Sequence, residues 1–96
     1  MIDELYELVL GEEGFLVKLR CKNFFDEVEY SKIKQILKIL VNEWISIDAI
    51  PKKGVLLTIE LVEFLARNNS FLSKEDSIKV EDASIEIKDI LNVLYL

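Results

Sequence analysis

The stretch YSKIKQILKILVNEWISID, residues 30–48, decides the fold class. Its apolar side chains recur every three or four residues, the spacing that places them on one side of an α-helix. Such a helix must bury its apolar stripe against other elements of the chain. We therefore predict a core-facing helix over residues 30–48, with Ser31 or Asp26 capping its start. Its stripe consists of Ile33, Ile36, Leu37, Leu40, Val41 and Trp44.

The next segment carries a second helical pattern. Pro51 favours the first turn of a helix, where its missing N–H has no intrahelical partner. Residues 55–66 are apolar on nearly all sides, a pattern typical of a helix at the centre of a fold. Asn68-Asn69-Ser70 then indicates its end. The two apolar rows of this helix are Val55, Ile59, Val62 and Ala66, and Leu57, Leu61 and Phe64.

The last helix has both a start signal and a periodic apolar face. Ser73 precedes Glu75 and Asp76, which is a helix cap followed by acids in the first turn. The pattern continues to about residue 94. The predicted inner face consists of Val80, Ala83, Ile87, Ile90, Leu91 and Leu94.

The amino-terminal third is harder to assign. Residues 2–10 have helical spacing, and Gly11 and Gly14 indicate a break after them. Residues 15–22 suit either a strand or a short helix, and we favour the helix because a strand needs a partner for its backbone. The prediction is one all-α domain over residues 1–96, a small antiparallel bundle of four to five helices. The alternative is an α+β fold with a short strand at residues 15–22.

Composition excludes most enzyme classes. The 96 residues include no histidine and one cysteine, so there is no imidazole base, no His-assisted nucleophile and no histidine metal ligand. We expect no cofactor and no catalytic residue. Cys21 is predicted to be a small buried side chain rather than a reactive thiol. Because we find no export signal, membrane span or disulfide pair, we expect a cytoplasmic protein.

One enzymatic alternative uses carboxylates alone. Glu60 and Glu63 lie one helical turn apart, and either they or the acids of the last helix would have to hold a divalent cation by their oxygens. A solvated helix face explains the same spacing, and we favour it because charged residues are rarely buried without a partner.

The net charge of −6 lies mostly at the two ends of the chain. Residues 1–30 contain eight acids and three bases, and residues 71–96 contain six acids and three bases. Nucleic-acid binding depends on clusters of lysine and arginine, so we expect no nucleic-acid partner. A basic protein is the partner that the charge favours.

The last helix contains the candidate site. Acids gather on the side opposite its predicted inner face, with two isoleucines beside them and Lys79 as the one nearby base. Apolar anchors beside like charges are typical of a surface that binds a partner. The alternative is a solvated helix whose isoleucines are covered by the amino-terminal segment. The predicted partner-binding residues are Glu75, Ile78, Asp82, Ile85, Glu86 and Asp89.

Two functional hypotheses follow. In size, acidity and lack of catalytic groups the chain resembles bacterial immunity proteins, which neutralise cognate toxins. The resemblance is one of general character, and it implies a non-enzymatic inhibitor that binds a basic protein such as a toxin. The alternative is a self-associating structural or adaptor subunit, in which a homodimer buries Ile39, Ile78 and Ile85.

Overall fold

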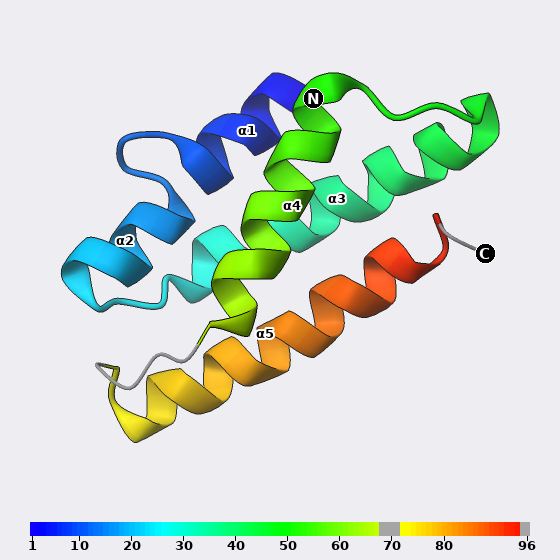
Figure 1. The fold of residues 1–96 in the computed structure, drawn as a ribbon. Helices are drawn as coiled ribbons and strands as arrows, with labels where there is room; N and C mark the ends of the chain where they lie inside the picture. The colour runs from blue at the N-terminus through cyan, green and yellow to red at the C-terminus, as the bar shows by residue number, and fades with distance from the viewer. Residues whose placement is uncertain (68–71, 95–96) are drawn as a thin grey trace.

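The computed structural model describes residues 1–67 and 72–94. These residues form five helices and no strand (Figure 1). The prediction of an all-α bundle is therefore confirmed. The predicted stop at 68–70 lies outside the described residues. The helices are α1 (Ile2–Leu10), α2 (Phe15–Lys22), α3 (Glu27–Ile47), α4 (Lys52–Ala66) and α5 (Lys74–Asn92).

Residues 15–22 form a helix, so the alternative of a strand is wrong. The consecutive residues Phe15 and Leu16 are both buried, together with Leu19. A strand would have turned Phe15 and Leu16 to opposite faces, whereas a helix brings both to the core. The prediction that Cys21 is buried is also wrong, because its side chain lies on the exposed side of α2.

Helix α3 begins directly after Asp26, one of the two residues predicted to cap it. The carboxylate of Asp26 accepts a hydrogen bond of 3.0 Å from the backbone N–H of Glu29, which satisfies a free donor of the first turn. The predicted stripe faces the core, with Ile33 and Leu37 fully buried and Ile36 partly buried. The longest helix of the fold is thus set by local sequence signals.

Helix α4 differs from its prediction. Its buried side contains Leu57, Leu61 and Phe64, whereas Val55 and Ile59 of the other row are 41% and 49% exposed. Helices α1 and α5 pack against it, and of the second row only Val62 is partly buried against the core. The prediction of a helix buried on two sides is therefore wrong.

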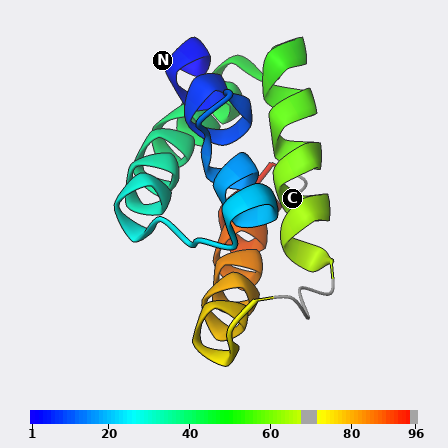
Figure 2. The same ribbon diagram turned by 90° about the vertical axis from the view of Figure 1, so that its left-hand side faces the viewer.

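The arrangement of the helices places α5 at an edge of the bundle. Helix α4 crosses in front of α3, with its start near α1 and its end near α5 (Figures 1 and 2). Helices α3 and α5 run in the same direction, since Glu27 pairs with Lys79 and, one heptad further along both helices, Lys34 pairs with Glu86. One long side of α5, which contains Ile78 and Ile85, remains exposed to solvent.

Candidate protein-binding surface

The orientation of α5 is set by its cap and its inner face. The Ser73 hydroxyl accepts a hydrogen bond of 3.1 Å from the backbone N–H of Asp76 and fixes the start of the helix. One side of the helix is then buried in the core through Val80, Ala83, Ile87 and Leu91. Ile90 and Leu94 of the predicted inner face pack at its margin.

The two isoleucines singled out by the sequence are exposed. Ile78 is 50% and Ile85 is 62% exposed. The alternative in which the amino-terminal segment covers them is wrong, because α1 packs against α2, α3 and α4 instead. Large apolar side chains are thus accessible on the outer side of α5.

The acids beside the isoleucines are all exposed, but they are not equivalent. Lys34 Nζ lies 2.7 Å from a carboxylate oxygen of Glu86, and Lys79 Nζ lies 3.8 Å from one of Glu75. Among the described residues, Asp82 and Asp89 have no ion-pair partner. The expectation that Lys79 is the one base beside the stripe is therefore wrong, since Lys34 reaches it from α3.

A buried tyrosine, Tyr30, lies on the α3 flank of the acids. Tyr30 is 7% exposed, and the Lys34 ammonium lies 5.0 Å from the centre of its ring. Burial raises the pKa of the Tyr30 hydroxyl, and the charges of Glu86 and Asp82 raise it further. A hollow lined by Tyr30, Asp82 and Glu86 lies between α3 and α5 on this flank.

A groove between α4 and α5 lies on the other flank of Ile85. Its volume is about 530 Å³. Ile59 and Val62 contribute apolar surface from α4, and Leu91 does so from α5. The groove could not be seen in the sequence, because the periodicity of α4 predicts that the Ile59 row faces the core. The lining residues are Thr58, Ile59, Val62, Glu63, Ile85, Lys88, Asp89, Leu91 and Asn92.

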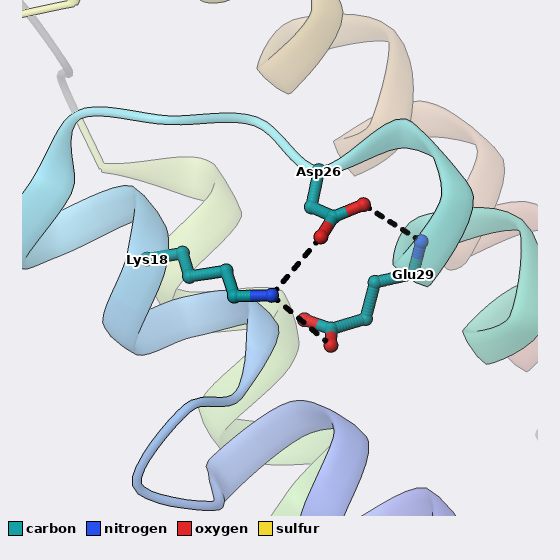
Figure 3. Close-up of polar contacts among 3 residues, drawn as sticks. All are labelled: Lys18, Asp26 and Glu29. Carbon is teal, nitrogen blue, oxygen red and sulfur yellow. Dashed lines mark hydrogen bonds and ion pairs between the residues drawn. The ribbon is translucent and has the colours of Figure 1, made fainter.

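A second polar cluster joins α2 to the start of α3 (Figure 3). Lys18 Nζ lies 3.0 Å from Asp26 Oδ2 and 3.5 Å from Glu29 Oε2. The other carboxylate oxygen of Glu29, Oε1, is buried without a hydrogen-bond partner among the described residues. Only the capping role of Asp26 was visible in the sequence, because Lys18 belongs to another helix.

The two carboxyls of this cluster have pKa values shifted in opposite directions. The backbone N–H of Glu29 and then the Lys18 ammonium lower the pKa of Asp26, because both stabilise its charged form. Burial raises the pKa of Glu29, against the opposing effect of Lys18. A negative charge on Glu29 is therefore held at a cost to the folded state.

This difference predicts a pH-dependent effect of Glu29→Gln. A carboxyl with a raised folded-state pKa stabilises the fold below its unfolded pKa, and that contribution is lost as pH rises through the folded pKa. Glutamine stays neutral, so the free energy of unfolding of the variant relative to wild type is expected to be higher at pH 7 than at about pH 4. Urea unfolding at both values measures it. Glu43→Gln, at an exposed position of α3, is the matched control. An equal effect of Glu29→Gln at both pH values would contradict the assignment.

The carboxylates that were considered as a metal site, Glu60 and Glu63, do not form one. Glu60 and Glu63 are both exposed. Within residues 1–67 and 72–94, no group of three or more His, Cys, Asp or Glu side chains is placed to hold a metal ion. In the same part of the chain, no helix combines the length and apolarity needed to cross a membrane.

Comparisons of the chain with protein-family models, with curated proteins and with solved structures find no match. The fold and the surface therefore define a structural class of protein but no family. The chain is an all-helical bundle in which one long helix exposes isoleucines beside acids.

Proposed function

We propose that the chain is a non-enzymatic binding protein that recognises a basic protein through the outer side of α5. The observation that carries the proposal is the exposure of Ile78 and Ile85 next to Asp82 and Asp89, two carboxylates without an ion-pair partner among the described residues. Apolar anchors supply affinity once they are buried in a partner. Carboxylates without an ion-pair partner attract and orient a basic surface before contact.

The six residues have different roles in this proposal. Ile78 and Ile85 are the anchors, and Asp82 and Asp89 are the charges that meet the partner. Glu86 is paired with Lys34, and Glu75 lies 3.8 Å from Lys79, so both contribute less net attraction. An inhibitor of a basic toxin, of the immunity type, is the biological role that such a surface suits.

A charge-reversal experiment tests the proposal. The immobilised full chain captures basic proteins from its native source, and binding kinetics are then measured with the protein recovered. Asp82→Lys combined with Asp89→Lys is expected to slow association about tenfold or more at low salt, because steering attraction becomes repulsion. Ile85→Ser is expected mainly to speed dissociation.

The matched control carries the same change in net charge at a different place. Glu43→Lys combined with Glu60→Lys reverses two exposed acids on α3 and α4. This control is expected to slow association much less. Equal slowing by both pairs would show that only overall charge matters, and unchanged kinetics in the first pair would remove α5 as the binding surface.

A further inference from the structure

Helix α4 carries an exposed apolar row that the proposed function does not use. Val55, Ile59, Val62 and Ala66 follow one another at intervals of four, three and four residues. This spacing is that of the a and d positions through which two helices pack side by side. Val55 and Ile59 are 41% and 49% exposed, Val62 is half-buried and Ala66 is exposed. We call these four residues the α4 seam.

The seam lies directly beside the groove between α4 and α5. Ile59 and Val62 belong to both, and Ile85 and Leu91 continue the apolar surface onto α5. The same face thus presents a ridge and a hollow next to each other. A two-fold interface needs a self-complementary face, and a ridge beside a hollow lets each copy supply both the projecting and the receiving surface.

Charges beside the seam favour a second copy as its partner. Lys52 lies one turn before Val55, and Glu63 follows Val62 directly. An antiparallel pair of α4 helices brings Lys52 of each copy towards Glu63 of the other, whereas a parallel pair places like charges together.

We infer that the α4 seam pairs two copies of this chain, with their α4 helices antiparallel and Ile59 near the two-fold axis. In this arrangement Val55 of each copy faces Val62 of the other. The acids Glu75, Asp82 and Glu86 of α5 are not part of the seam. The two surfaces share Ile85 and Asp89. The test variants therefore avoid both residues, so that the pairing and the proposed function are tested separately.

Sedimentation equilibrium of the full chain tests the pairing. From about 5 to 500 µM, wild type is expected to rise reversibly from 11.1 kDa towards twice that mass. Ile59→Glu is expected to lower the association constant about 30-fold or more, since it places two charges at the centre of the interface. Thermal unfolding of the same samples checks that each variant is folded.

The chain offers a closely matched control for this variant. Ile39 on α3 is exposed to the same extent as Ile59, 49% in each case. Ile39→Glu is therefore expected to leave the association constant within about twofold of wild type. A wild type that stays monomeric at the highest concentration would overturn the inference. So would equal losses in the two folded variants.

A charge swap tests the antiparallel direction. Lys52→Glu and Glu63→Lys are each expected to weaken pairing several-fold, because each places like charges together twice in the dimer. Both substitutions together restore the opposite charges and are expected to return the association constant to near wild type. A double variant that pairs more weakly than either single variant would exclude the antiparallel arrangement.

Discussion

Phe15→Ala is expected to lower the free energy of unfolding by about 3–5 kcal/mol, the range observed for truncating a fully buried phenylalanine. Phe15 is 0% exposed. Its ring meets Phe25 edge-on at 5.2 Å between centroids and stacks on Tyr30 at 5.7 Å. The substitution removes both contacts and leaves a cavity between α2 and α3.

The expected loss of stability is large because these rings pack α2 against the rest of the fold. A helix of eight residues is too short to be stable alone in water. Without Phe15, α2 keeps Leu16 and Leu19 in the core, together with the ion pairs of Lys18. We therefore expect α2 to loosen before the rest of the bundle unfolds.

Urea unfolding followed by circular dichroism measures the effect. Phe24→Ala is the matched control, because Phe24 is 51% exposed and lies two residues after the end of α2. It is expected to change stability by about 0.5 kcal/mol or less. Similar losses for Phe15→Ala and Phe24→Ala would contradict the packing of α2 described above.

Gly54→Ala is expected to destabilise the protein by about 1–3 kcal/mol, the cost typical of overpacking a core. In an exposed helix interior the same change stabilises by about 0.8–1 kcal/mol. Gly54 is instead buried in the first part of α4. A Cβ atom there would lie 2.8 Å from Cζ2 and 2.9 Å from Cη2 of Trp44, and 3.2 Å from Cγ2 of Ile50.

The sign of this effect depends on the rigid indole ring of Trp44. That side chain is 3% exposed and cannot rotate away without disturbing the core. A double-mutant cycle isolates the clash, since in a Trp44→Leu background Gly54→Ala is expected to lose most of its cost. Urea unfolding followed by circular dichroism measures all four proteins. Stabilisation by Gly54→Ala in the wild-type background would show that α3 and α4 do not approach this closely.

The parts of the fold that could be predicted are those set by neighbouring residues in the chain. The Asp26 and Ser73 caps act over three residues, and the structure contains both hydrogen bonds. Helical spacing likewise identified the buried sides of α3 and α5. Local periodicity fixes which side chains share a face, because the helix repeat is the same in every fold.

The candidate site was predicted only in part. The exposure of Ile78 and Ile85 follows from their position away from the inner face of α5. The ion-pair partner of Glu86 could not be predicted in this way. Lys34 lies 52 residues away in the chain and reaches Glu86 through the packing of α3 against α5. The groove beside Ile85 was missed for the same reason, since α4 forms its other wall.

The sequence by itself determined that this chain is helical, where most helices begin and end, and which rows of side chains are apolar. Only the tertiary structure decided which apolar rows are covered. Leu57 and Ile59 are equally suited to a core by their chemistry, yet Leu57 is fully buried and Ile59 is half exposed. Periodicity describes one helix, whereas burial depends on which other helices pack against it, and that is a property of the whole chain.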